Sequence, residues 1–252
     1  MALVENTDHM KKYSSNAFEI LKDFSFPPLK FSEEEKAEWQ AIFFDSIITE
    51  YDARRLYWCI EAKNPELMTK LEDTLNPWLK DEIDHAYGFS LIYSAYTGLP
   101  LDEIALSVET RKSDFSSLDS FISDPLKLLI LLAYDEIITT HVYHRSIKKY
   151  DHFNSPQLST WIRKAKKDES KHFFLFIEKI KLMYSHRLLE APSILKSLFE
   201  LDFEKEHYTG TFVLDHNTFD YPISRTDIEK TIIPTIIKKL NTATDLTRGY
   251  DK

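Results

Sequence analysis

A six-residue motif that combines carboxylates with an imidazole occurs twice in this 252-residue chain. The first copy, KDEIDH, covers residues 80–85, and the second, KDESKH, covers residues 167–172. Both read K-D-E-x-x-H and place Glu82 before His85 and Glu169 before His172. Positions i and i+3 of a helix lie on one face. Each Glu–His pair can therefore point a carboxylate and an imidazole at the same place.

Each copy is preceded by another glutamate at a matched spacing. Glu50 lies 32 residues before Glu82, and Glu136 lies 33 residues before Glu169. All four glutamates have mainly apolar neighbours on their helical faces, which predicts that they point into a core. A buried carboxylate without a partner costs several kcal/mol, on the order of the penalty for an isolated ion. Four of them together would also repel one another.

Cations would resolve both problems. A bundle that binds two metals in its core takes one Glu from each of two helices and a Glu-x-x-His from each of the other two. Oxygen ligands with one imidazole per metal suit iron or manganese. The sequence therefore predicts a two-metal site whose ligands are Glu50, Glu82, His85, Glu136, Glu169 and His172.

Several alternatives remain open for these residues. The doubled motif could form a hydrogen-bonded polar core without metal, and Asp45 or Asp52 could replace Glu50. Asp135 adjoins Glu136, and His141 or His144 could also reach a metal. A third Glu-x-x-His, at 204–207, is highly charged and lacks a preceding carboxylate helix, so we do not assign it to the site.

The aspartate before each motif glutamate also has a predicted role. A ligating histidine normally donates its other N–H to a carboxylate or carbonyl. We expect Asp168 to brace His85 and Asp81 to brace His172. The alternative is that both aspartates lie on the surface.

The helices that would carry these residues are delimited by capping residues and prolines. A capping box at Ser32 and Glu35 opens the first, and Asn64-Pro65, Asp124-Pro125 and Ser155-Pro156 open the next three. The predicted long helices are 33–63, 65–97 with a kink or division at Asn76-Pro77, 125–149 and 156–189.

The remaining segments are predicted to be shorter or irregular. Residues 1–31 form an irregular lead-in, and 101–124 a crossover of short helices and turns. Helices follow at 191–207 and at 225–240, the latter interrupted by Pro234, with a hairpin-like excursion at 208–224. These elements indicate an all-α fold and a single domain, with a core bundle at about 33–189 and a C-terminal extension at about 190–252.

Composition sets limits on the partners and the compartment. A net charge of −9 argues against nucleic acid or an anionic membrane as the main partner. The longest apolar run is too short to span a bilayer, and the N-terminus lacks a signal peptide pattern. The single cysteine, Cys59, is expected to be a buried thiol and excludes a Cys-based metal site. We expect a cytoplasmic protein.

The motifs resemble the ferritin-like di-iron carboxylate family over about residues 33–189. The resemblance implies a ferritin-like four-helix bundle with additional C-terminal helices, two Fe ions (with Mn/Fe or Mn/Mn as alternatives), and bridging roles for Glu82 and Glu169. The nearest subfamilies are the aldehyde-deformylating oxygenases and the N-oxygenases. Phe89 stands where ribonucleotide reductase small subunits carry a radical tyrosine, and Ala165 where N-oxygenases carry a third histidine.

The function that this resemblance implies is an O₂-dependent oxygenase or oxidase. It would oxidise a small, hydrophobic or carrier-bound organic substrate with electrons from an external donor. Thr140, one turn after Glu136, could relay protons or could simply pack in the core, and Tyr57, Tyr87 and Tyr143 could carry electrons or line the pocket. A homodimer is left open, and a non-enzymatic metal-binding or partner-binding bundle is the competing function.

Overall fold

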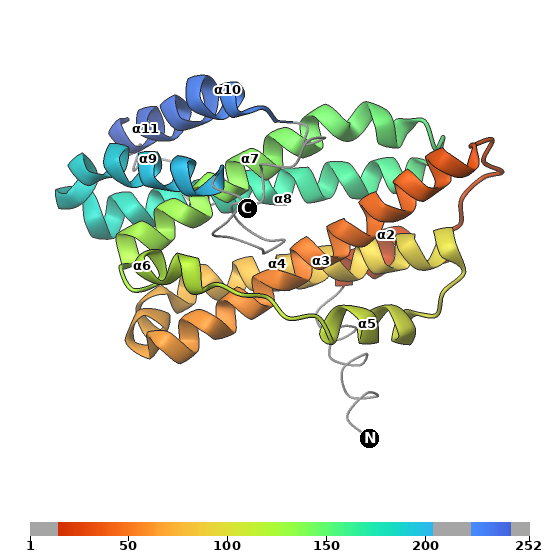
Figure 1. The fold of residues 1–252 in the computed structure, drawn as a ribbon, viewed down its shortest axis with the longest axis horizontal. Helices are drawn as coiled ribbons and strands as arrows, with labels where there is room; N and C mark the ends of the chain where they lie inside the picture. Colours follow the sequence, from red (N-terminus) through yellow and green to blue (C-terminus); the bar gives the residue numbers. More distant parts are fainter. Residues whose placement is uncertain (1–14, 204–222, 243–252) are drawn as a thin grey trace.

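The protein is a bundle of four long helices with shorter helices packed around it (Figure 1). The computed structural model describes residues 15–203 and 223–242, and it contains no β-strand within these ranges. The long helices are α3 (Glu33–Lys63), α4 (Pro65–Thr97), α7 (Pro125–Asp151) and α8 (Pro156–Tyr184). The predicted all-α class is confirmed. Among the described helices, none has the length and apolarity needed to cross a membrane.

Two helical hairpins make up the bundle. Helix α3 packs along α4, helix α7 packs along α8, and α4 and α8 contact each other between the hairpins. The turns inside the hairpins are short, which makes neighbouring helices antiparallel. Each hairpin thereby brings one single-glutamate helix beside one helix that carries the Glu-x-x-His motif.

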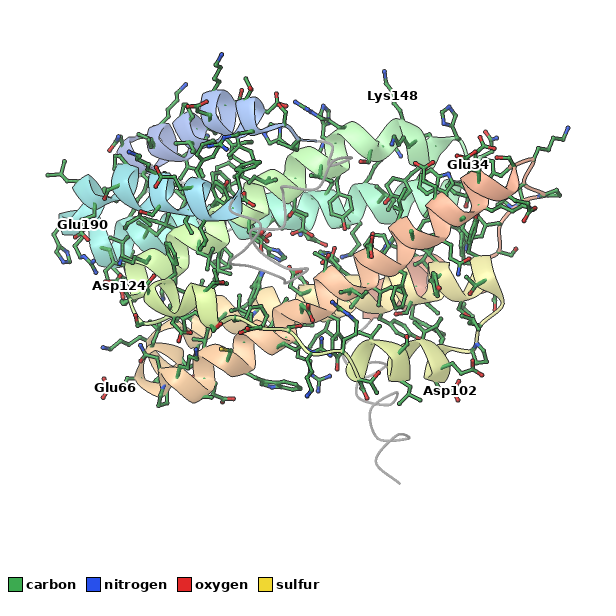
Figure 2. All side chains as sticks on the ribbon, in the orientation of Figure 1. Glu34, Glu66, Asp102, Asp124, Lys148 and Glu190 are labelled. Carbon is green, nitrogen blue, oxygen red and sulfur yellow. The ribbon has the colours of Figure 1, made fainter. Side chains whose placement is uncertain are left out.

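The predicted capping residues begin these helices. Side-chain oxygens of the N-cap residues accept backbone N–H groups that have no partner within the helix; these caps are Ser32, Asn64, Asp124 and Ser155. Acidic residues in the first turn of α3, α4 and α5 (Leu101–Glu109) favour the positive end of each helix dipole. Figure 2 labels one in each of these turns, Glu34, Glu66 and Asp102.

Helix α4 runs without a break through Pro77, so the predicted division at Asn76-Pro77 does not occur. The helix ends at Gly98, which has a positive φ of 78°. Glycine adopts this left-handed conformation at little cost, and it is the usual residue at such a helix end. Continuity of α4 matters because Trp78 and the first motif follow Pro77 directly.

The crossover between the hairpins contains short helices, as predicted. They are α5, the 3₁₀ turn η1 (Ser116–Leu118) and α6 (Asp119–Ile122). Arg55 of α3 binds this segment, because its guanidinium donates to the Val108 carbonyl at 2.7 Å. Asp52, on α3 itself, accepts from the same guanidinium at 2.6 Å and orients it.

Other boundaries differ from the predictions. The lead-in is not wholly irregular, because α2 (Ser15–Leu21) is helical and lies against α4 and α8. The fourth helix ends at Tyr184 and continues as the 3₁₀ segment η2 (Ser185–Glu190). Helix α9 spans Ala191–Asp202. The predicted continuation to 207, most of the hairpin at 208–224, and the polar tail from 243 lie outside the described residues.

The last predicted helix consists of three pieces. These are α10 (Arg225–Asp227), the π-helical turn η3 (Ile228–Ile232) and α11 (Ile233–Asn241). Pro234 stands in the first turn of α11, where a missing N–H costs nothing. The predicted interruption thus falls where α11 begins, next to Pro234.

The buried apolar side chains fall into two clusters along the bundle. On α3, Phe43 and Ile47 belong to one cluster and Leu56 and Ile60 to the other. Along α4, α7 and α8, membership likewise changes from one cluster to the other near the predicted ligands. The change occurs close to Glu50 on α3. A layer of polar side chains thus crosses the bundle between two apolar halves.

Helices α4 and α8 approach closely beside this layer. A Cβ built on Gly88 would lie 2.0 Å from the Trp161 ring, which is fully buried. The Trp161 ring also lies against the imidazole of His85, with 6.0 Å between ring centroids. Glycine at position 88 therefore lets the indole pack beside a predicted ligand.

We predict that Gly88→Ala destabilises the protein by ~1–3 kcal/mol, as expected when a packed interior is overfilled. The clash outweighs the gain of about 1 kcal/mol that alanine brings to a helix. Chemical denaturation of the metal-free protein measures the change. In a Trp161→Leu background the same substitution should be neutral or stabilising, and equal losses in both backgrounds would contradict the packing argument.

Candidate metal centre

The six side chains predicted as ligands come together in the polar layer. They form two groups whose ligand atoms lie within 4.8 Å of one another: Glu50, Glu82, His85 and Glu169 in the first, and Glu82, Glu136, Glu169 and His172 in the second. All are buried. Glu82 and Glu169 belong to both groups, so the two groups share two carboxylates.

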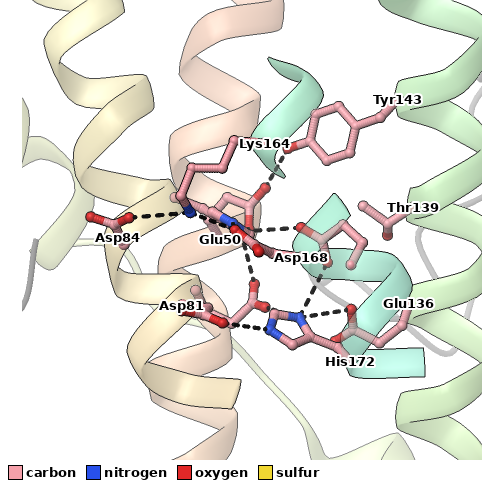
Figure 3. Close-up of polar contacts among 12 residues, drawn as sticks. Glu50, Asp81, Asp84, Glu136, Thr139, Tyr143, Lys164, Asp168 and His172 are labelled. Atoms are coloured by element: carbon pink, nitrogen blue, oxygen red, sulfur yellow. Dashed lines mark hydrogen bonds and ion pairs between the residues drawn. The ribbon is translucent and has the colours of Figure 1, made fainter. Parts of the chain in front are cut away.

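Both histidines turn the same ring nitrogen toward the carboxylates. His85 Nδ1 lies 3.1 Å from Glu169 Oε1 and 3.4 Å from Glu50 Oε2. His172 Nδ1 lies 3.1 Å from Glu82 Oε1 and 3.2 Å from Glu136 Oε2 (Figure 3). Each Nε2 faces away from the shared carboxylates. The two imidazoles are therefore placed alike, although they come from different helices.

Several of these close atoms do not hydrogen-bond to one another. His85 Nδ1, Glu82 Oε1 and Glu169 Oε1 are buried and make no hydrogen bond of good geometry. These atoms are close enough to hydrogen-bond, so it is the orientation of the side chains that prevents the bonds. Buried oxygen and nitrogen atoms that gather within 4.8 Å of one another without satisfying each other are what a cation-binding site offers. The residues present therefore fit a metal.

The chemistry of the donors narrows the type of metal. Each group offers three carboxylates and one imidazole. Oxygen-rich sites with nitrogen from histidine suit iron and manganese, whereas sites with thiolates favour zinc or copper. Each group could thus hold a metal ion, and Glu82 and Glu169 belong to both groups.

Two aromatic residues hold the carboxylates that are not shared. The Tyr143 hydroxyl donates to Glu50 Oε1 at 2.6 Å, and the Trp78 indole N–H donates to Glu136 Oε1 at 2.6 Å. Each bond uses one carboxylate oxygen and leaves the other for the site. Trp78 is a residue whose contact with Glu136 the sequence reasoning missed. Trp78 lies one turn before Glu82 on the same helical face, which could have indicated that its indole reaches the site.

The aspartates pair with the histidines in the predicted crossed manner. Asp81 Oδ2 lies 3.2 Å from His172 Nε2, and Asp168 Oδ2 lies 3.5 Å from His85 Nε2. Asp168 is buried, whereas Asp81 is partly exposed. The alternative of two surface aspartates is wrong for Asp168. A carboxylate at Nε2 favours a proton on that nitrogen and leaves Nδ1 free to bind a cation.

Burial and mutual repulsion shift the pKa values of the metal-free cluster. Burial, with Glu169 nearby, raises the pKa of Glu82 well above its usual range, and burial raises that of Glu136 similarly. Burial alone would lower the pKa of His85, but the surrounding carboxylates outweigh it and raise this pKa. The pKa of His172 is raised for the same reason. Burial opposes ionisation of Glu169, yet the two histidines hold its pKa low.

Other candidates from the sequence lie outside the two groups. Asp52 is paired with Arg55 and Arg111, so it does not replace Glu50. The Thr140 hydroxyl donates to the Glu136 carbonyl at 2.8 Å, which directs it at the helix backbone. Asp45, Asp135, His141 and His144 are in neither group.

The structure also shows the surroundings of Tyr57 and Cys59. The Tyr57 hydroxyl donates to Asn76 Oδ1 at 2.6 Å and so turns away from the carboxylates. Cys59 is half-buried and not fully buried as expected, and burial raises the pKa of its thiol. The Glu-x-x-His at 204–207 lies outside the described residues.

Comparison with known proteins returned no matching family model, no matching curated sequence and no matching solved structure.

We predict that Glu82→Gln abolishes metal binding at one or both groups, because both use this carboxylate. His172→Ala should remove binding at one group only. Metal content after anaerobic loading measures both effects, and Glu178→Ala, an exposed change on α8, is the control. Unchanged metal content in Glu82→Gln would remove the assignment.

We also predict that Glu82→Gln makes the metal-free protein more stable by ~0.5–2 kcal/mol, the usual gain when a strained functional group is removed. The substitution removes a buried carboxyl that other carboxylates surround. Chemical denaturation in the presence of a chelator measures the change. A metal-independent polar network would instead lose stability.

Metal binding should release protons and weaken as the pH falls. The raised pKa values of Glu82, Glu136, His85 and His172 mean that the metal-free cluster holds protons near neutral pH. A bound ion needs deprotonated ligands. We expect a net release of protons on metal binding, measured by calorimetry in buffers of different ionisation enthalpy. Uptake of protons would contradict this reasoning.

Proposed function

We propose that the chain is a non-haem di-iron oxygenase or oxidase built on a ferritin-like bundle. The observation that carries the proposal is the pair of overlapping donor groups that share Glu82 and Glu169. One Glu comes from each of α3 and α7 and one Glu-x-x-His from each of α4 and α8, which is the ligand pattern of carboxylate-bridged two-metal bundles.

Two irons bound there would supply the reduction of O₂ and the oxidation of an organic substrate, with electrons from an external donor. The role of the chain is to position the ions and keep water out. Tyr143 and Trp78 orient Glu50 and Glu136, and Asp81 and Asp168 orient the imidazoles. Glu82 and Glu169 would bridge the two ions.

The surroundings of the site favour an apolar substrate. Buried aromatic rings border the polar layer, among them Trp78 with Phe176 on one side and Phe89 with Trp161 on the other. These rings exclude water from the carboxylates and offer no charge to a substrate. We therefore propose a small hydrophobic or carrier-bound organic substrate.

Oxygen consumption tests this function. The iron-loaded protein, supplied with a reductant, should consume O₂ in multiple turnovers when a substrate is present, and we would screen fatty aldehydes, acyl carriers and aromatic amines. Glu50→Ala should lower this rate at least tenfold, because it removes one ligand group. Glu178→Ala should match the wild type.

The competing function predicts a different result. A metal-storing bundle would consume O₂ only in proportion to the ferrous ion added, with no dependence on the organic compound. A protein that binds no iron under anaerobic loading would contradict both functions and leave a partner-binding bundle.

A further inference from the structure

The two histidines of the site are backed by aspartates in different electrostatic surroundings. His85 faces Asp168, and His172 faces Asp81. The donor groups themselves are matched, since each contains one histidine and three glutamates. A difference between the two groups can therefore come from the residues that contact the donors from outside, and the aspartates at the histidines differ most in charge.

Asp168 is held between two lysines. Lys164 Nζ lies 2.5 Å from Asp168 Oδ2, and Lys171 Nζ lies 2.5 Å from Asp168 Oδ1. Lys164 is mostly buried and also lies 3.6 Å from Asp84 Oδ2. Figure 3 shows Lys164 between Asp84 and Asp168. The negative charge behind His85 is thus neutralised at close range.

Asp81 has no such cations. Within the described residues its recorded close partner is His172, and no lysine or arginine is within ion-pair distance of it. Asp81 is 32% exposed, so water screens part of its charge. Its charge is nevertheless not cancelled by a cation in contact.

The different surroundings of Asp81 and Asp168 follow from sequence differences between the two motif copies. When KDEIDH is aligned with KDESKH, Asp84 occupies the position of Lys171. Four residues before each motif aspartate, Pro77 occupies the position of Lys164. One aspartate therefore has lysines at i−4 and i+3 on its own helix, positions that lie on one face. The other has a proline and a second aspartate there.

Asp84, which takes the place of Lys171 in the first motif, makes its contacts with Ala17 and Lys164. Its Oδ1 accepts the backbone N–H of Ala17 at 3.0 Å, and its Oδ2 faces Lys164 across the α4–α8 interface. Helix α2 and Asp84 thereby help to hold Lys164 in place. The lysine remains in contact with Asp168, the shorter of its two ion pairs.

We propose that the two metal positions differ in affinity, that the position at His172 fills first, and that Lys164 sets this order by neutralising Asp168. The inference rests on the proposed function. A carboxylate behind a ligating imidazole makes the ring a stronger donor. Asp81 does so with an uncancelled charge, whereas Asp168 is paired with cations. Less negative charge near His85 also attracts a cation less strongly.

The order of filling is tested by titrating the metal-free full chain stepwise with Fe²⁺ under anaerobic conditions, with calorimetry as the readout. Two binding steps alone do not decide the matter, because ions that share Glu82 and Glu169 repel each other in any case. The assignment comes from variants that change one side. Circular dichroism of each metal-free variant checks that the fold is kept.

Asp81→Asn should weaken the first binding step by about tenfold and leave the second nearly unchanged, the size expected for loss of a partner behind a ligand. Lys164→Met should strengthen the second step by about tenfold and the first step much less, because Lys164 contacts Asp168 but acts on Asp81 only from a distance. Lys164→Arg, which keeps the charge, should behave like the wild type. Lys167→Met removes an exposed lysine beside Asp168 and is the matched control.

Three results would overturn the order of filling. They are a second step weakened as much as the first in Asp81→Asn, a first step strengthened as much as the second in Lys164→Met, or an equal effect of Lys164→Met and Lys167→Met. Each of these leaves metal binding, and so the proposed function, intact. The absence of any Fe²⁺ binding by the wild type would instead overturn the proposed function and this inference with it.

Discussion

The burial of several carboxylates in one small volume is the constraint on which the structure depends. Glu50, Glu82, Glu136 and Glu169 are each at most 5% exposed, and their mutual repulsion would expel them from the core if nothing opposed it. Two imidazoles oppose it in part, and a phenol and an indole each bind one carboxylate oxygen. One oxygen of each shared carboxylate, Glu82 Oε1 and Glu169 Oε1, still lacks a hydrogen bond. The long helices and their caps can be understood as the framework that holds this unfavourable layer in place.

Much of the fold and of the donor set could be predicted from sequence because both rest on local rules. Proline and N-cap residues mark where the long helices begin, and helical spacing places Glu82 and His85 on one face. The contacts that the sequence did not predict join different helices. Trp78 of α4 reaches Glu136 of α7, and Lys164 of α8 pairs with Asp84 of α4, only because the two hairpins pack together in a particular rotation. Spacing within one helix carries no information about that rotation. Helix α2 was missed because its seven residues are too few to show a clear helical period of apolar residues.

The internal two-fold pattern of the chain is kept at the donors and at the aspartates that face the histidines. It is lost at the residues that bind Glu50 and Glu136. Tyr57 and Tyr143 both lie seven residues after a donor glutamate, but only Tyr143 reaches the opposite helical hairpin. Trp78 takes the place that Tyr57 would have filled at Glu136. Identical donors in unequal surroundings give two positions that chemistry can distinguish. The asymmetry therefore lies in the residues that orient the donors, where substitution does not remove a ligand.

The position of the polar layer along the bundle determines how a small molecule could reach it. Glu50 lies well inside a helix of 31 residues, so at 1.5 Å of rise per residue the layer is roughly 20–25 Å from either end of α3. Apolar clusters fill the bundle on both sides of it. A small molecule that travelled along the bundle axis would have to displace many packed side chains, whereas a sideways path between two helices is much shorter. Side-chain motions at the flank of the bundle, more than any opening at its ends, would then set the rate of exchange with solvent.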